Sequence, residues 1–171
     1  TVGHKVCITR DKEVASVVIA ATPNQIVVRA YRGILANDTQ LDREVAVKRL
    51  SLDDAPEARR LALKEARVVA RLTHPNIAQL HDVVELDGVI HLVMEYIEGS
   101  TLASVLGRAT MSESQVCDIG GQIADALAFA HAHGVVHCDV KPSNVMLTRG
   151  GIAKLLDFGI CKVLHADPMD S

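Results

Sequence analysis

Short apolar runs separated by turn residues dominate the first half of the chain. Residues 26–31 and 45–47 are apolar and largely β-branched, and glycine, asparagine and aspartate lie between them, which is typical of strands joined by turns. Two further apolar runs, 77–85 and 89–96, flank Asp87-Gly88, a dipeptide that favours a tight β-hairpin. This pattern predicts a β-rich first part.

Two helices are predicted from local signals. Pro56 and Glu57 suit the first turn of a helix that we expect to run to about Leu72, because proline is preorganised there and an acidic group favours the positive end of the helix. Ser112 and Gln115 fit a capping box, and Gly134 suits a helix end. Apolar residues then recur at helical spacing, namely at Val116, Ile119, Ile123 and Leu127. We therefore expect one long helix from Ser112 to His133.

The composition limits the classes of protein to which this chain can belong. The 171 residues are 49% hydrophobic and 23% charged, as in globular domains. A net charge of −3 and only 2% aromatic residues argue against a nucleic-acid partner, which needs basic patches and stacking platforms. The most apolar stretch is too short to span a membrane. Four cysteines without a C-x-x-C pair predict reduced thiols and a cytoplasmic location; the oligomeric state stays open.

One charged pair is suggested by the strand and helix patterns. Glu65 falls within the apolar face of the first helix, where a carboxylate requires a cationic partner. Lys48 lies on the strand face opposite Val45 and Val47, so Lys48 and Glu65 could meet. The alternative is that both side chains are solvated at the edges of their elements.

A second group of polar residues lies between apolar runs near the end of the chain. Residues 137–144 read His-Cys-Asp-Val-Lys-Pro-Ser-Asn, and Asp157 follows another apolar run. Asp139, Asn144 and Asp157 would supply oxygen ligands suited to Mg²⁺, and Lys48 and Lys141 would supply positive charge for phosphate oxygens.

These motifs together resemble the protein kinases, and more closely the bacterial serine/threonine kinases. Val45-Ala46-Val47-Lys48 resembles the V-A-I-K strand, Glu65 the glutamate that pairs with its lysine, residues 137–144 the H-R-D-L-x-x-x-N loop, and Asp157-Phe158-Gly159 the D-F-G motif. The resemblance implies an α+β, two-lobe fold. Residues 26–97 would form the β-rich N-lobe with one helix, residues 98–171 an incomplete helical C-lobe, and the role of residues 1–25 is uncertain.

The resemblance also implies roles for individual residues. Asp139 and Lys141 would be catalytic, and Asn144 and Asp157 would hold Mg²⁺. Lys48, held by Glu65, would contact the α and β phosphates of ATP. The adenine site would be formed by Ala30, Ala46, Met146, the gatekeeper Met94, and the hinge from Glu95 to Ile97. The implied function is transfer of the γ phosphoryl group of ATP to serine or threonine of a protein substrate.

Three features depart from the family pattern. No glycine lies between Gly3 and Gly33, so the loop that should cover the phosphates lacks the residues that allow close backbone approach, and weakened nucleotide binding is expected. Cys138 replaces an arginine that binds a phosphorylated activation loop; we expect a small buried residue and activity independent of that phosphorylation. Only 12 residues follow Gly159, which predicts a fragment truncated after the D-F-G motif.

Alternative interpretations remain open on the sequence. The glycine-free loop would suit a pseudokinase that binds nucleotide or serves as a scaffold without turnover. The H-x-D-x-x-x-x-N pattern at 137–144 also occurs in small-molecule phosphotransferases of the aminoglycoside-kinase type. His131, His133 and His137 beside Cys138 could suggest zinc, although capping of helix carbonyls is the simpler interpretation of the first two.

Overall fold

The computed structural model describes residues 6–7, 28–30, 33–38, 41–50, 56–86 and 88–158. The chain forms two compact units. The first comprises the residues up to Ala58 together with Leu80–Tyr96, and the second comprises Arg59–Gln79 together with the residues from Ile97 onward. By its packing the segment 59–79 therefore groups with the second unit. The predicted lobe boundaries stay predictions, and the expectation for residues 1–25 lies outside the described residues except at Val6–Cys7.

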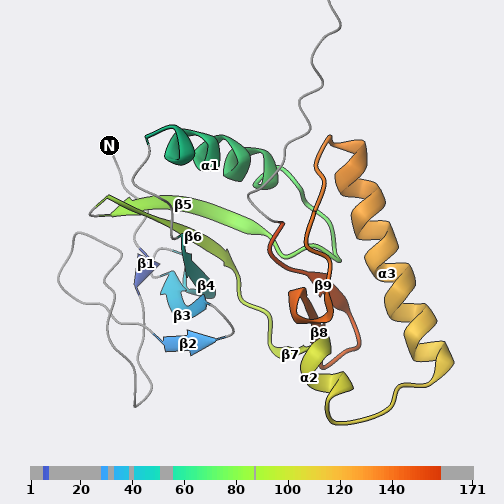
Figure 1. Cartoon of the computed structure of the whole chain (residues 1–171). Coiled ribbons are helices and arrows are strands. Elements are labelled where there is room, and N and C mark those ends of the chain that lie inside the picture. The colour runs from blue at the N-terminus through green and yellow to red at the C-terminus, as the bar shows by residue number, and fades with distance from the viewer. Residues whose placement is uncertain are drawn as a thin grey trace, which may run out of the picture. The chain divides into compact units, whose positions relative to one another are not determined.

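The first unit is built on an antiparallel sheet (Figure 1). Its strands are β1 (Val6–Cys7), β2 (Val28–Ala30), β3 (Gly33–Asp38), β4 (Arg43–Arg49), β5 (Leu80–Leu86) and β6 (Val89–Glu95). Their order is β1-β3-β4-β6-β5, with β2 also paired to β3. The predicted hairpin joins β5 to β6, and Gly88 has a φ of 76°, which glycine adopts without strain.

Alternation along β4 separates two faces of this sheet. Val45 and Val47 are fully buried, while Ala46 and Lys48 occupy the other face and are partly exposed, as the sequence pattern indicated. Val47 lies directly across from Val93 of β6, which is also buried. Such facing β-branched pairs stabilise an antiparallel sheet and fix its register.

Helix α1 (Pro56–Val69) ends three residues before the predicted Leu72. After Val69 the amides of Arg71 and Leu72 bond three residues back, to Val68 and Val69, which is the tightened turn common at helix ends. This turn allows Leu72 to enter the core, where it is 1% exposed. The predicted helix end was therefore wrong, because an apolar residue at helical spacing belongs to the turn.

The second unit combines a small sheet with the long helix (Figure 1). Strands β7 (Gly99–Thr101), β8 (Val145–Thr148) and β9 (Ala153–Leu155) pair antiparallel in that order. Helix α2 (Leu102–Leu106), helix α3 (Glu113–Ala132) and the 3₁₀ helix η1 (Pro142–Asn144) complete the described part of the unit. The α+β class expected from the sequence is confirmed.

Helix α3 begins and ends where the local signals predict. The Gln115 amide donates to Ser112 Oγ at 3.3 Å, and the Ser112 amide donates to Gln115 Oε1 at 2.9 Å, so the capping box is formed. At the other end Gly134 has a φ of 72°. One face of α3 packs Ala126 and Ala130 into the core with residues of β8 and β9. No helix in the described part of the chain has the length and apolar character needed to cross a membrane.

Candidate active site

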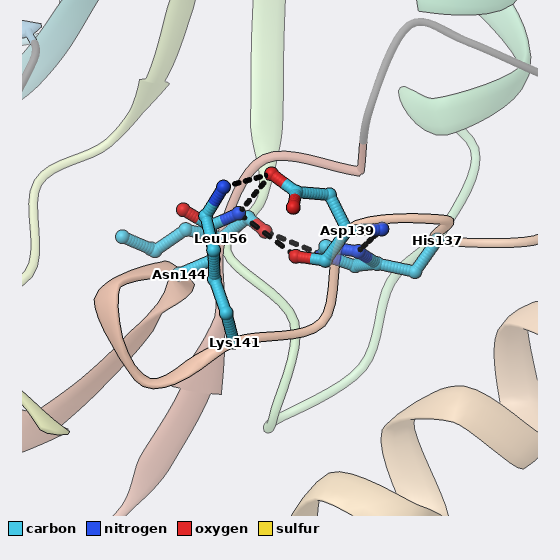
Figure 2. A network of polar contacts seen from close by, with 5 residues as sticks. All are labelled: His137, Asp139, Lys141, Asn144 and Leu156. Atoms are coloured by element: carbon cyan, nitrogen blue, oxygen red, sulfur yellow. Dashed lines mark hydrogen bonds and ion pairs between the residues drawn. The ribbon is translucent and has the colours of Figure 1, made fainter. Parts of the chain in front are cut away.

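Asp139 is held by two side chains from the loop that connects α3 to β8 (Figure 2). Lys141 Nζ lies 2.5 Å from Asp139 Oδ2, and Asn144 Nδ2 donates to the same oxygen at 2.9 Å. Asn144 Nδ2 also donates to the backbone carbonyl oxygen of Asp139 at 2.9 Å. Asn144 sits in η1, where Pro142 begins the turn. The short 3₁₀ turn thus brings an amide five residues downstream back onto the carboxylate.

These contacts define the charge state of Asp139. The hydrogen bond from Lys141, helped by that from Asn144, holds the pKa of the Asp139 carboxyl below its usual value of 3.8. The Asp139 side chain is 53% exposed, so it presents an anionic oxygen to solvent. Lys141 and Asn144 both donate to Oδ2, and neither of them bonds to Oδ1.

His137 links this loop to the strand segment that precedes Asp157. The Asp139 amide donates to His137 Nδ1 at 3.2 Å, so Nδ1 is the unprotonated nitrogen. Nε2 therefore carries the hydrogen and donates to the Leu156 carbonyl oxygen at 2.7 Å. The ring is 1% exposed and lies 4.8 Å from the ring of Phe158, centroid to centroid. This buried imidazole connects the two segments directly.

Asp157 follows β9 with an unusual backbone conformation. Its φ is 48°, in the left-handed region, which aspartate tolerates better than most residues. The preceding Leu156 amide donates to the Asn144 carbonyl oxygen at 2.8 Å, and Phe158 is buried in the core of the unit. The structure therefore brings Asp139, Lys141, Asn144 and Asp157 onto two segments that hydrogen-bond to each other. Gly159 lies outside the described residues.

Cys138 differs from its expectation. The sequence suggested a small buried residue, but the Cys138 side chain is exposed. The reason is its backbone, which has a φ of 59° and turns the side chain outward between the buried His137 ring and the exposed Asp139. Cys138 in this loop and Asp157 in the neighbouring segment both have a left-handed φ, which is local strain of the kind that accumulates at functional sites.

The first unit holds part of the expected nucleotide site. Ala46 and Met94 are directly opposite each other in the β4–β6 pair, and Lys48 is two residues along β4 on the same face as Ala46. Glu95 ends β6. Ala30 lies in β2, paired with Gly33; its side chain is outside the described set. The structure thus brings Ala46, Met94 and Lys48 to one face of the sheet.

The second unit holds the remaining expected residues. Glu65 is on α1 and 5% exposed, which confirms that its carboxylate lies within the apolar face rather than in solvent. Ile97 and Met146 are buried. Met146 lies in β8 between Thr101 of β7 and Lys154 of β9, close in sequence to Asn144.

Sequence reasoning missed two residues that support this site. Gln122 of α3 and Asn76, in the segment after α1, hydrogen-bond to each other and to β9. The sequence signal that could have identified Gln122 was the presence of an uncharged amide beside Ile119 and Ile123 on the inward face of α3. Zinc has no support in the described part of the chain, where no three His, Cys, Asp or Glu side chains gather; His133 Nδ1 instead donates to the Phe129 carbonyl oxygen at 2.8 Å.

Comparison with known proteins independently identifies the family of this chain. Residues 31–171 match the family model described as protein kinase domain. The serine/threonine-protein kinase PrkC of Bacillus subtilis is 39% identical over 135 residues, which cover 77% of this chain and 21% of PrkC.

Two solved structures have the same fold. The kinase domain of Mycobacterium tuberculosis PknI, as its C20A mutant, matches with a TM-score of 0.73 and 33% identity over 88% of this chain and 64% of that chain. Rad53 1-466 in complex with AMP-PNP matches with a TM-score of 0.67 and 26% identity over 78% of this chain and 36% of that chain.

The matched regions also show how much of its relatives' length the chain covers. It spans 19% of the serine/threonine-protein kinase CPE1738 of Clostridium perfringens and 33% of the serine/threonine-protein kinase PknA of Mycobacterium tuberculosis, so it covers less than two thirds of the length of these relatives. The family model covers the strand with Lys48, the helix with Glu65, and the segments with Asp139 and Asp157. The chain therefore belongs to the protein kinase domain family, has a kinase fold, and is similar to bacterial serine/threonine kinases.

Proposed function

We propose that this chain carries the catalytic elements for ATP-dependent phosphoryl transfer to serine or threonine residues of protein substrates. The observation that carries the proposal is the arrangement around Asp139, whose carboxylate is held by Lys141 and Asn144 beside the segment that leads to Asp157. Family membership and the kinase names of its relatives support it. The cytoplasm, which supplies ATP and keeps thiols reduced, is the corresponding location.

Asp139 would orient the hydroxyl group of the substrate. Its Oδ1 is the oxygen left for that hydroxyl, because Lys141 and Asn144 both bind Oδ2. A carboxylate with a lowered pKa is a weak base at neutral pH, since general bases work best with a pKa near the operating pH. Orientation of the hydroxyl for in-line attack is therefore its main contribution, and proton acceptance follows as the bond to phosphorus forms.

Lys141 and Asn144 would each contribute to binding of the transferring phosphoryl group. Lys141 supplies a cation within reach of the phosphoryl oxygens while it keeps Asp139 ionised. Asn144 uses its amide nitrogen for both bonds to Asp139, so its amide oxygen is the donor atom that remains. That oxygen and the Asp157 carboxylate are hard ligands suited to Mg²⁺. The metal, when bound, would neutralise charge on the phosphates.

Each unit carries residues with an expected role in nucleotide recognition. In the first unit, Lys48 would contact the α and β phosphates of ATP, Ala30, Ala46 and Met94 would contact adenine, and the backbone of Glu95 would hydrogen-bond the edge of the base. In the second unit, Met146 would contact adenine and the backbone of Ile97 would hydrogen-bond the edge of the base. Because no glycine lies between Gly3 and Gly33, phosphate contacts would depend mainly on Lys48 and the metal, so we expect modest affinity for ATP.

Binding and phosphoryl transfer by the 171-residue chain test this proposal. Calorimetry would measure ATP binding with and without Mg²⁺, and radiolabelled ATP would measure transfer to a library of serine- and threonine-containing peptides. We expect magnesium-dependent binding and slow transfer. Asp139→Asn should abolish transfer and keep binding, whereas Asp118→Asn, an exposed carboxylate on α3, should leave both unchanged.

Other results of these binding and transfer measurements would favour the alternative functions. Magnesium-dependent binding without transfer to any substrate would select the pseudokinase or scaffold. Transfer to sugars or amines but not to peptides would select the small-molecule phosphotransferase. Equal activity of Asp139→Asn and the parent chain would exclude the proposed site.

A further inference from the structure

Gln122 makes a closed set of hydrogen bonds between α3 and β9. Its Oε1 accepts from the Ala153 amide at 2.8 Å and from Asn76 Nδ2 at 2.8 Å. Asn76 Nδ2 also donates to the Ala153 carbonyl oxygen at 2.8 Å, and Gln122 Nε2 donates to the Gly151 carbonyl oxygen at 3.3 Å. Both backbone polar groups of Ala153 are therefore bonded to these two side chains.

These contacts complete the edge of β9 that β8 does not occupy. The Ala78 amide donates to the Leu155 carbonyl oxygen at 3.0 Å, and the Leu155 amide donates to the Asn76 carbonyl oxygen at 2.8 Å. Ala153 and Leu155 are both buried, where an unpaired backbone group is costly. The side chains of Gln122 and Asn76 thus hydrogen-bond to the backbone at the beginning of β9. The backbone of residues 76–78 hydrogen-bonds to the backbone at its end.

The segment held in this way leads directly to Asp157. One residue beyond β9, Leu156 donates to the Asn144 carbonyl oxygen and accepts from His137 Nε2. Asp157 comes next, with its left-handed φ. Since Asp157 is only four residues from Ala153, a shift at the start of β9 is transmitted through a short, fully bonded strand to the carboxylate.

We propose that Gln122 is a positioning residue for Asp157: its amide oxygen clamps the start of β9 and so fixes the distance between the Asp157 carboxylate and the Asn144 amide oxygen. This inference rests on the proposed function, because Asp157 and Asn144 are there the ligands of the magnesium nucleotide. Gln122 itself touches neither substrate nor metal. A purely structural role would stabilise the unit without affecting metal affinity.

Two variants of Gln122 separate the acceptor atom from side-chain size. Gln122→Met has a similar length and helix propensity but no oxygen, so the Ala153 amide loses its acceptor. Gln122→Glu retains carboxylate oxygens that can accept from Ala153 and Asn76 and loses only the donor to Gly151. Asp125→Asn, exposed on the same helix, is the matched control.

Each variant of the full chain is measured in two ways. Amide hydrogen exchange reports the local opening of β9, and calorimetry at several Mg²⁺ concentrations reports the metal dependence of ATP binding. For Gln122→Met we expect exchange at Ala153, Leu155 and Leu156 to rise roughly tenfold, as for the loss of one buried hydrogen bond. The Mg²⁺ concentration for half-maximal ATP binding should rise about fivefold, while metal-free ATP affinity stays the same.

The results for the Gln122 variants test the role of Gln122, and they can be distinguished from a failure of the proposed function. Recovery of slow exchange and of the parent Mg²⁺ dependence by Gln122→Glu supports it. Unchanged exchange and Mg²⁺ dependence in Gln122→Met overturn it, as does a lower melting temperature with parent-like Mg²⁺ dependence. If the parent chain binds no magnesium nucleotide, the proposed function fails and the metal-positioning inference falls with it, whereas the exchange data still show whether Gln122 clamps β9.

Discussion

The side-chain nitrogen of Asn144 donates to two oxygens of Asp139, the backbone carbonyl oxygen and carboxylate Oδ2, both at 2.9 Å. Asn144 is 3% exposed, whereas Asp139 faces solvent, so a buried amide fixes an exposed carboxylate. The backbone of Asn144 is bonded in turn to Lys141 and Leu156. This arrangement holds the orientation of Asp139 before any substrate arrives, which is the preorganisation that electrostatic catalysis requires.

Replacing Lys141 should raise the pKa of Asp139. In the Lys141→Met variant the carboxyl group loses its largest stabilising contact, the hydrogen bond from Lys141, so its pKa should return toward 3.8. Because the folded pKa in the parent chain is lowered, this contact stabilises the fold above the unfolded pKa, and that contribution is lost as the pH falls through the folded value. Carbon-13 NMR titration of the Asp139 carboxyl would measure the change.

The control for this titration is Arg149→Met, which removes an exposed cation that pairs with Glu98 instead. The Asp139 pKa should not change in that variant. An unchanged Asp139 pKa in Lys141→Met would show that the ion pair is not maintained in solution.

Local signals predicted some elements well. The capping box at Ser112 and Gln115 and the left-handed Gly134 define helix α3 without tertiary information. The burial of Glu65 also followed from its place in the apolar stripe of α1. These features depend on residues within one or two helical turns, and the periodicity of the sequence reports them directly.

Other features depend on residues far apart in the chain and could not be predicted. The bond between Asn76 and Gln122 joins residues 46 positions apart, and neither has a local pattern that indicates the other. The exposure of Cys138 follows from a backbone φ of 59°, whereas the usual burial of free cysteine suggested the opposite. Leu72 continues the helical spacing of α1 although it lies in the following turn.

Replacing Gly99 with alanine should disrupt the pairing of β7 with β8. A Cβ atom at Gly99 would lie 2.1 Å from the Leu147 carbonyl oxygen, and backbone cannot move aside as a flexible side chain can. We expect Gly99→Ala to lower the free energy of unfolding by about 1–3 kcal/mol, the usual range for overpacking. Urea denaturation followed by circular dichroism would measure it.

Gly120 provides the matched comparison for this substitution. It lies within α3, and a Cβ there meets nothing within 4 Å. Gly120→Ala should therefore raise the free energy of unfolding by about 0.5–1 kcal/mol through helix propensity. If both alanine variants changed stability equally, the close approach of β7 to β8 at Gly99 would be incorrect.

The effect of substitutions at Cys138 on stability should depend on how well the new residue tolerates the left-handed backbone conformation. A β-branched side chain is strained at a φ of 59°, whereas asparagine tolerates this region. We expect Cys138→Val to destabilise the chain by about 1–2 kcal/mol and Cys138→Asn to be neutral. Thermal denaturation of both variants tests this expectation, and Cys117→Val, on the exposed part of α3, controls for loss of the thiol. Equal stability of the Val and Asn variants would argue against the left-handed conformation.

The first unit should lose stability as the solution becomes mildly acidic. Burial lowers the pKa of His91 below its ordinary value of 6.5, and Arg49 lies directly across from it in the β4–β6 pair. Burial also lowers the pKa of His81 in β5, where Arg43 adds to the effect. Both rings are therefore neutral in the folded chain at pH values where the unfolded chain already binds protons.

Stability is consequently full above pH 6.5 and declines as the pH falls below it toward the folded pKa values. His91→Gln should reduce this decline, and the double variant His81→Gln/His91→Gln should reduce it further. Amide exchange of β4 and β6 at pH 7.5, 6.5 and 5.5, corrected for intrinsic rates, would follow the first unit alone. His131→Gln, in α3 of the second unit, should keep the parent pH dependence of β4 and β6; a parent-like decline in the double variant would show that other groups cause the acid sensitivity.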